Sequence, residues 1–142
     1  MGEEVLLIAY WDGNDGAKGA GVYCRWLRGD GMYKVHLLTS KAKTNKLGMK
    51  NTPMSEMDGA LIAANLLATV VEALQGTQAV KNAMRIGDNN AVLGTRCRDS
   101  APFGEWYRKW ITETWEMQWR CEDIGCKVSK WWHCASMDNG AD

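Results

Sequence analysis

The sequence predicts an α/β fold with a mixed five-stranded sheet flanked by helices. Strand-length apolar runs separated by glycine-containing turns fill the N-terminal part of the chain. A long segment with helical spacing of its apolar residues follows. After this segment come two further short apolar runs, which are separated from each other by sequence with helical character. The order is typical of a three-stranded antiparallel meander plus two further strands, the fourth running parallel to the first.

The first three strands are predicted at residues 5–11, 19–27 and 33–40. The first is an apolar run that suits a strand buried on both faces, and it stops immediately before Asp12. Glycines frame the turn that leads to the second strand, so the two are expected to form a hairpin.

The long helix is predicted to start at Thr52 and Pro53, which suit the N-cap and the first helical position, and to close at Gln75 and Gly76. One face of it carries Glu56, Ala60, Ala63, Leu67, Val71 and Leu74.

The rest of the chain is predicted as a fourth strand at 83–87, helices at 89–96 and 102–119, a loop at 119–126, and a fifth strand at 127–134. Trp106, Trp110 and Trp115 in the third helix are interpreted as a packing face, with a base-stacking platform as the alternative. This packing is expected in the core or against another domain.

Size and composition are those of one folded domain covering residues 1–142. Hydrophobic residues make up 46% and charged residues 24%, which argues against disorder. Lys plus Arg equals Asp plus Glu, at 17 each, so the net charge says nothing about partners.

The five cysteines follow an N-terminus without a basic signal-peptide region, which predicts reduced thiols and an intracellular location, cytoplasmic or nuclear. A zinc site from Cys121, Cys126, His133 and Cys134 is disfavoured, because the spacing fits no common ligand pattern. No apolar run is long enough to suggest a membrane span, so no membrane partner is expected.

Three acidic residues occupy positions where a carboxylate is costly. Asp12 ends the first strand, Asp88 ends the fourth, and Glu56 opens the apolar face of the long helix. Parallel neighbours would bring Asp12 and Asp88 to one edge of the sheet, and Asp142 lies beyond the fifth strand. Two negative charges about 4 Å apart repel by roughly 4 kcal/mol at an effective dielectric of about 20. Divalent ions with oxygen ligands, Mg²⁺ or Mn²⁺, would offset that repulsion and support phosphodiester cleavage.

Each acid also has a structural explanation. Asp12 suits a turn, Asp88 suits a helix N-cap, and Glu56 suits the first turn of a helix. Asp142 is unremarkable as a terminal residue. The joint placement favours the metal site.

A lysine-rich stretch precedes the long helix. No acid occurs between Gly31 and Ser55, whereas Lys41, Lys43 and Lys46 fall there. These lysines suit an anionic partner, and the alternative is a solvated loop.

Four segments resemble one family, and they follow in its order along the chain. They are AYWDGNDGAKGAGVYCRW, LLTSKAKTNKLGMKNTPMSEMDGALIAANLL, IGDNNAVLG and WWHCASMDNGAD. The chain resembles the ribonuclease H domain of LTR-retrotransposon polyproteins of the BEL/Pao type. The resemblance implies a ribonuclease H-like fold and cleavage of the RNA strand of RNA:DNA hybrids during reverse transcription.

Carried over to this sequence, the resemblance implies a two-metal site made by Asp12, Glu56, Asp88 and Asp142. The hybrid would be bound by Lys41, Lys43 and Lys46, with Asn14 and Asn89 donating hydrogen bonds to sugar or phosphate. The cofactors would be two Mg²⁺ or Mn²⁺ ions, and a reverse transcriptase domain of the same polyprotein is an expected partner.

The sequence departs from the family pattern at three places. The segment Pro53-Met54-Ser55-Glu56 lacks the usual arginine, Cys134-Ala135-Ser136 replaces Val-Pro-Gly, and Asn139-Gly140 replaces Asn-Pro. His133 falls inside the fifth strand rather than in the loop after it, and is interpreted as structural.

Two other functions remain as alternatives. One is an inactive ribonuclease H-like module that binds nucleic acid or docks another domain. The other is a recombinase of the same superfamily, which would need Glu122 as a ligand, within the predicted loop at 119–126.

Overall fold

The computed structural model describes residues 5–13, 16–44, 52–74, 80–87 and 104–133, without the side chains of 52–56, 104–107 and 129–133. Its five strands are β1 (Val5–Gly13), β2 (Ala17–Leu27), β3 (Tyr33–Thr44), β4 (Val80–Gly87) and β5 (Lys127–His133). Its helices are α1 (Thr52–Leu74) and α3 (Gly104–Asp123). The helix predicted at 89–96 lies outside the described residues.

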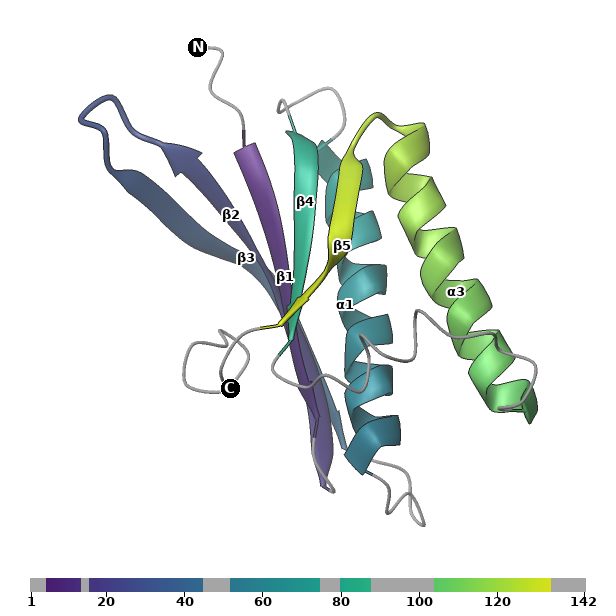
Figure 1. Ribbon diagram of the computed structural model, residues 1–142. Coiled ribbons are helices and arrows are strands. Elements are labelled where there is room, and N and C mark those ends of the chain that lie inside the picture. The colour runs from purple at the N-terminus through teal and green to yellow at the C-terminus, as the bar shows by residue number, and fades with distance from the viewer. Residues whose placement is uncertain (1–4, 14–15, 45–51, 75–79, 88–103, 134–142) are drawn as a thin grey trace.

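The strands form one mixed sheet in the order β3-β2-β1-β4-β5 (Figure 1). β1 pairs antiparallel with β2, and β2 with β3, which is the predicted meander. β4 runs parallel to both β1 and β5. The predicted fold class and the parallel placement of the fourth strand beside the first are therefore confirmed.

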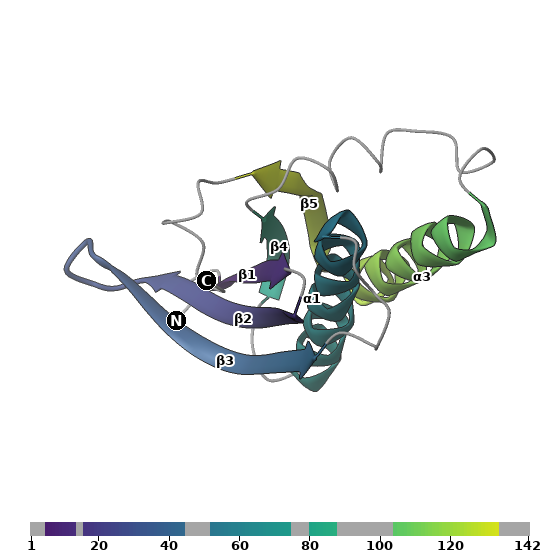
Figure 2. The same ribbon diagram turned by 90° about the horizontal axis from the view of Figure 1, so that it is seen from below.

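Both described helices lie on the same face of the sheet, α1 over the central strands and α3 beside it near β5 (Figure 2). The α1 face that the sequence predicts is buried, because Ala60, Ala63, Leu67 and Val71 are each at most 3% exposed. Leu7, Ala9 and Trp11 of β1 oppose it and are fully buried. This layer of α1 on β1 forms the hydrophobic core.

α1 also corrects one expectation. Its segment Met57–Leu74 is long and apolar enough to span a membrane by length and composition. Half of that segment is buried inside the protein, which is typical of a core helix in a globular domain.

The C-terminal end of α3 differs from the sequence prediction. The segment 119–126 is not a loop, because α3 continues to Asp123 and carries Glu122 within it. The helix ends in a Schellman motif, in which Cys126 N donates to Cys121 O (3.0 Å) and Gly125 N donates to Glu122 O (2.9 Å). Gly125 supplies the positive φ of 99° that this ending requires.

The tryptophan face of α3 is only partly as predicted. Trp110 is 1% exposed, whereas Trp115 is 38% exposed. Because an α-helix turns about 100° per residue, Trp115 points well away from Trp110, five positions earlier. The side chain of Trp106 lies outside the described residues.

Candidate active site

Asp12 lies within β1 rather than in a turn. The strand extends to Gly13, and Asp12 pairs with Gly19 of β2. Its carboxylate is half-buried, and Oδ1 accepts the N–H of Gly13 at 2.9 Å. The predicted strand end at Trp11 is thus two residues short. Pairing with β2 holds Asp12 in extended backbone, so the turn-acid explanation of this residue is wrong.

The ends of β1 and β4 are level with one another. Trp11 pairs with Gly87, the last residue of β4. The indole of Trp11 occupies the space that a side chain at Gly87 would need, so Gly87 lets the ring pack over the strand end. The next residue along the chain is Asp88, which lies outside the described residues.

α1 approaches the same end of β1 through Gly59. A Cβ atom at this position would lie 2.9 Å from the carbonyl oxygen of Asp12 and 3.5 Å from Cδ1 of Trp11. Glu56 precedes Gly59 by about one helical turn. It is the fifth residue of α1, beyond the first turn, so the helix-dipole explanation is weakened. The backbone thus places Glu56 on the part of α1 nearest the Asp12 end of the sheet.

Asp58 and Met57, the two residues before Gly59 in α1, each make a contact that was not predicted from the sequence. Lys18 Nζ lies 2.6 Å from Oδ2 of Asp58, and the two side chains are 9% and 19% exposed. Trp110 donates its indole N–H to the carbonyl oxygen of Met57 at 2.6 Å. The partners are 40 and 53 positions apart, so no local spacing rule would have found them.

Among the predicted site residues, Asn14, Lys46, Asp88, Asn89 and Asp142 lie outside the described residues, as does the Glu56 side chain. Within the part of the chain that is described, no three His, Cys, Asp or Glu side chains come close enough together to hold a metal ion. The half-buried Asp12 carboxylate is the hard oxygen donor that Mg²⁺ or Mn²⁺ requires. A shared ion with the other three acids remains a prediction.

The lysines of the predicted nucleic-acid surface lie on a strand rather than in a linker. β3 continues to Thr44, so Lys41 and Lys43 pair with Ala20 and Lys18 of β2. Strand alternation puts both lysines on the face that α1 covers, beside the Asp12 end of the sheet. Both are exposed. Asp12 pairs with Gly19, and Gly19 pairs with Ala42, so the Asp12 side chain points to the other face of the sheet. The two positive charges therefore lie at the same end of the sheet as Asp12 but on the opposite face.

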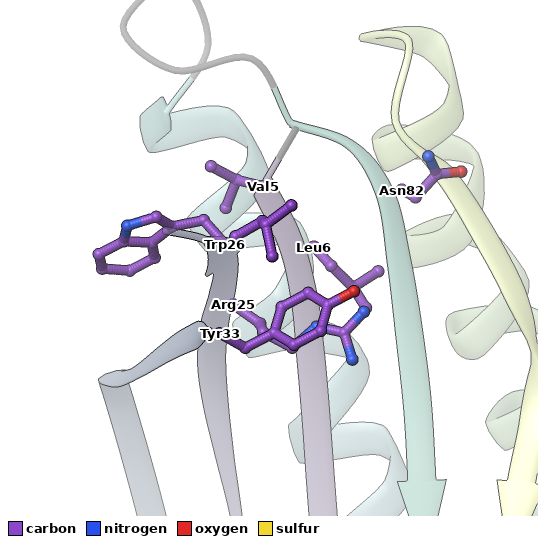
Figure 3. A pocket seen from close by; sticks show the side chains of 7 residues that line it. Val5, Leu6, Arg25, Trp26, Tyr33 and Asn82 are labelled. Carbon is purple, nitrogen blue, oxygen red and sulfur yellow. The ribbon is translucent and has the colours of Figure 1, made fainter. Parts of the chain in front are cut away.

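A hollow lies at the end of the sheet opposite Asp12 (Figure 3). There the guanidinium of Arg25 packs over the ring of Tyr33, 4.4 Å from its centroid. The hollow is lined by Val5, Leu6, Arg25, Trp26, Leu27, Tyr33 and Asn82. None of its described lining residues is acidic. At about 3.3 Å per residue, Leu6 is roughly 20 Å from Asp12 along β1, so this hollow is separate from the candidate active site.

Two of the cysteines considered for a zinc site, Cys121 and Cys126, are buried free thiols. Burial raises the pKa of Cys121 to about 12, with a further rise from the neighbouring Cys126. Burial likewise raises the pKa of Cys126 to about 11, with a smaller effect of Glu122. Cys134 and the side chain of His133 lie outside the described residues.

Solved ribonuclease H structures share this fold. The N-terminal RNase H domain of a Mycobacterium tuberculosis protein, solved as a fusion with maltose-binding protein, superposes with a TM-score of 0.55 and 10% identity. The match covers 94% of this chain and 88% of that one. LC11-RNase H1, isolated from compost and solved in complex with an RNA/DNA hybrid, gives 0.52 and 8% identity, over 96% and 88% of the two chains. Identities this low establish the fold alone.

The sequence comparison establishes the family. No curated protein matches the chain. Residues 2–88 match the family model described as Pao retrotransposon-like RNaseH-like domain. That range is more than half of the chain and includes Asp12, Glu56 and Asp88, while Asp142 lies beyond it. The chain belongs to the Pao retrotransposon-like RNaseH-like domain family.

Proposed function

We propose that this domain is a metal-dependent ribonuclease H that cuts the RNA strand of RNA:DNA hybrids during reverse transcription. Family membership and the ribonuclease H-like fold support the class of enzyme. The observation that carries the proposal is the position of Asp12. It lies at the end of β1, level with the end of β4, and is packed against α1 through Gly59.

The proposed ligands are Asp12, Glu56, Asp88 and Asp142. When two Mg²⁺ or Mn²⁺ ions are bound, they would activate the attacking water and stabilise the departing 3′ oxygen. The hydrogen bond from Gly13 N–H orients Oδ1 of the Asp12 carboxylate.

The nucleic acid would be held mainly through its phosphates. Lys41, Lys43 and Lys46 provide the charge, and Asn14 and Asn89 are proposed to donate hydrogen bonds to sugar or phosphate. The hybrid would be recognised by the shape of its groove and its 2′-hydroxyl groups rather than by base sequence. The structure of LC11-RNase H1 with such a hybrid supports this substrate class for the fold.

We further propose that residues 1–142 form one domain of a larger polyprotein and that α3 meets its reverse transcriptase domain. Trp115 and Trp119 support this contact. They are 38% and 55% exposed, and their rings pack at a centroid distance of 6.1 Å on the outer side of α3. Tryptophan is enriched at protein–protein interfaces relative to the rest of the protein surface.

The test of the activity is cleavage of an end-labelled RNA:DNA hybrid in Mg²⁺ or Mn²⁺. We expect the wild-type protein to shorten the RNA strand. Asp12→Asn should slow cleavage by more than about a hundredfold, the usual cost of losing a charged group that acts in the transition state. Asp123→Asn, at an exposed position of α3, is the matched control and should cut normally. Intact RNA with normal hybrid binding would instead identify an inactive binding module.

A further inference from the structure

Three consecutive residues of α1 are each fixed by a different element. The carbonyl of Met57 accepts the indole N–H of Trp110 from α3. The carboxylate of Asp58 pairs with Lys18 of β2. Gly59 packs on the backbone of Asp12 in β1. The segment Met57–Asp58–Gly59 is therefore clamped from three sides, directly after Glu56.

The Lys18–Asp58 pair is the polar part of this clamp. Nζ and Oδ2 are 2.6 Å apart, and both side chains are largely buried, so solvent screens the attraction less than at the surface. Lys18 also lies directly opposite Lys43 in the β2–β3 ladder. Like charges in that position repel, and Asp58 offsets the repulsion by neutralising Lys18.

The geometry points to Lys18 and Asp58 as positioning residues of the proposed active site, an inference that rests on the proposed ribonuclease function. The pair holds the N-terminal turns of α1 against the β1–β2 hairpin. It thereby sets where Glu56 stands relative to Asp12. Neither Lys18 nor Asp58 is assigned contact with the metal ions or the hybrid.

The inference predicts a local effect that can be measured without any activity. Lys18→Met and Asp58→Asn each remove one charge at similar side-chain size. In either variant, amide hydrogen exchange at residues 56–59 should accelerate by about tenfold, because the contact that resists local opening is gone. In the double variant Lys18→Met/Asp58→Asn, exchange at residues 56–59 should be no faster than in the single variants. The exchanged pair Lys18→Asp/Asp58→Lys should recover part of the protection against exchange.

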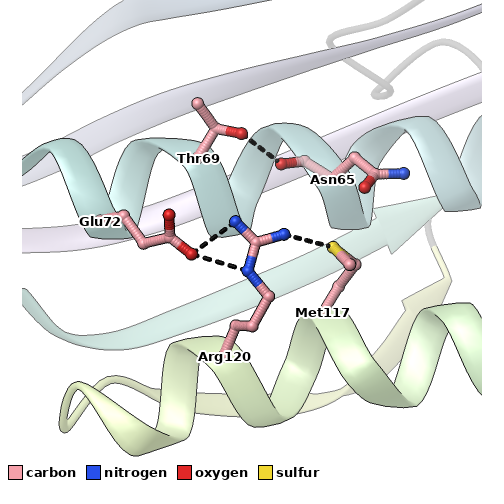
Figure 4. Close-up of polar contacts among 5 residues, drawn as sticks. All are labelled: Asn65, Thr69, Glu72, Met117 and Arg120. Atoms are coloured by element: carbon pink, nitrogen blue, oxygen red, sulfur yellow. Dashed lines mark hydrogen bonds and ion pairs between the residues drawn. The ribbon is translucent and has the colours of Figure 1, made fainter.

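A second ion pair on α1 gives the matched control. Arg120 of α3 binds Glu72 through Nε at 2.7 Å, near the C-terminal end of α1 (Figure 4). Glu72 is 14 residues beyond Asp58, or about 21 Å along the helix at 1.5 Å per residue. Glu72→Gln should therefore leave exchange at residues 56–59 unchanged. Unchanged exchange in Lys18→Met and Asp58→Asn, or equal acceleration in Glu72→Gln, would overturn the inference.

Hybrid cleavage then connects the clamp to catalysis. Lys18→Met should lower kcat by about ten- to a hundredfold, the scale expected when reacting groups are misplaced by about 1 Å, while KM for the hybrid stays unchanged. The Mn²⁺ concentration for half-maximal rate should rise, and Lys18→Arg should retain most of the activity. A wild-type protein that cuts no hybrid would refute the proposed function, whereas the exchange measurement would still decide whether the pair positions α1.

Discussion

A hydrogen bond between Trp110 and Met57 joins α3 to the N-terminal part of α1. Met57 lies two residues before Gly59, which packs on Asp12 near the end of β1. The indole N–H of Trp110 meets the carbonyl oxygen of Met57 at 2.6 Å, and the tryptophan is 1% exposed. This bond makes α3 part of the support for the candidate site, although α3 itself packs mainly beside α1 and β5.

Trp110→Phe should destabilise the fold by about 1–3 kcal/mol, because it removes a buried hydrogen-bond donor and leaves unfilled space. Urea unfolding followed by far-ultraviolet circular dichroism measures this difference. Trp119→Phe, at a position 55% exposed, should change the free energy of unfolding by less than about 0.5 kcal/mol. Equal effects of the two substitutions would contradict the packing described for α3.

Gly59→Ala should also destabilise the protein, by about 1–3 kcal/mol, since the added Cβ would lie 2.9 Å from the carbonyl oxygen of Asp12 and force α1 away from β1. In a helix free of such contacts the same change stabilises by about 1 kcal/mol, so the sign is diagnostic. Gly29→Ala is the control, because nothing lies within 4 Å of a Cβ built there. A more stable Gly59→Ala protein would show that α1 does not approach β1 this closely.

Lys41→Gln and Lys43→Gln should each weaken hybrid binding and reduce the slope of log affinity against log salt by about 1, as expected for a lost phosphate contact. Fluorescence anisotropy with a labelled hybrid between 50 mM and 200 mM salt provides the slope. Lys81→Gln is the control, because Lys81 is exposed at the start of β4, at the other end of the sheet. If all three substitutions reduce the affinity and the salt slope equally, Lys41 and Lys43 do not form a specific binding surface for the hybrid.

The buried thiols predict a loss of stability in alkali. The ordinary pKa of a cysteine thiol is 9.0. Below this pH, Cys121 and Cys126 are protonated in both the folded and the unfolded chain, so their full contribution to the free energy of unfolding is present. Between pH 9 and about 12 the unfolded chain releases these protons more readily, because folding raises the pKa values to about 12 and 11. The free energy of unfolding should therefore fall as pH rises through this window.

The control for this pH effect is the double variant Cys121→Ala/Cys126→Ala. The substitutions remove buried side-chain volume at every pH, but the stability of this variant should decline less steeply from pH 9 upward, because the two buried thiols no longer contribute. Identical slopes for the two proteins would mean that the thiols are not desolvated in the fold.

Much of the fold was predictable because local sequence and tertiary packing agree. The apolar run of β1 and the helical spacing of Ala60, Ala63, Leu67 and Val71 each match their burial in the structure. The strands β2 and β3 were predicted too short. Their ends, including Lys41 and Lys43, are extended by pairing with each other, which propensity alone does not reveal.

The errors in α3 have a similar origin. The predicted end at Trp119 is four residues short, because the actual end is set by Gly125 and the Schellman hydrogen bonds. Of the candidate site, the position of Asp12 at a strand end and the parallel placement of β4 followed from the pattern. The Lys18–Asp58 and Trp110–Met57 contacts depend on how distant segments meet, so the sequence offered no local signal for them.

The most direct test of the account is a crystal structure of the protein soaked in Mn²⁺, with anomalous scattering used to locate the ions. We predict ions at about 2.0–2.2 Å from carboxylate oxygens of Asp12, shared with Glu56, Asp88 and Asp142. An anomalous map without a peak beside Asp12, or coordinates that place Asp12, Glu56 and Asp88 in separate surroundings, would contradict the proposed active site and leave only the fold.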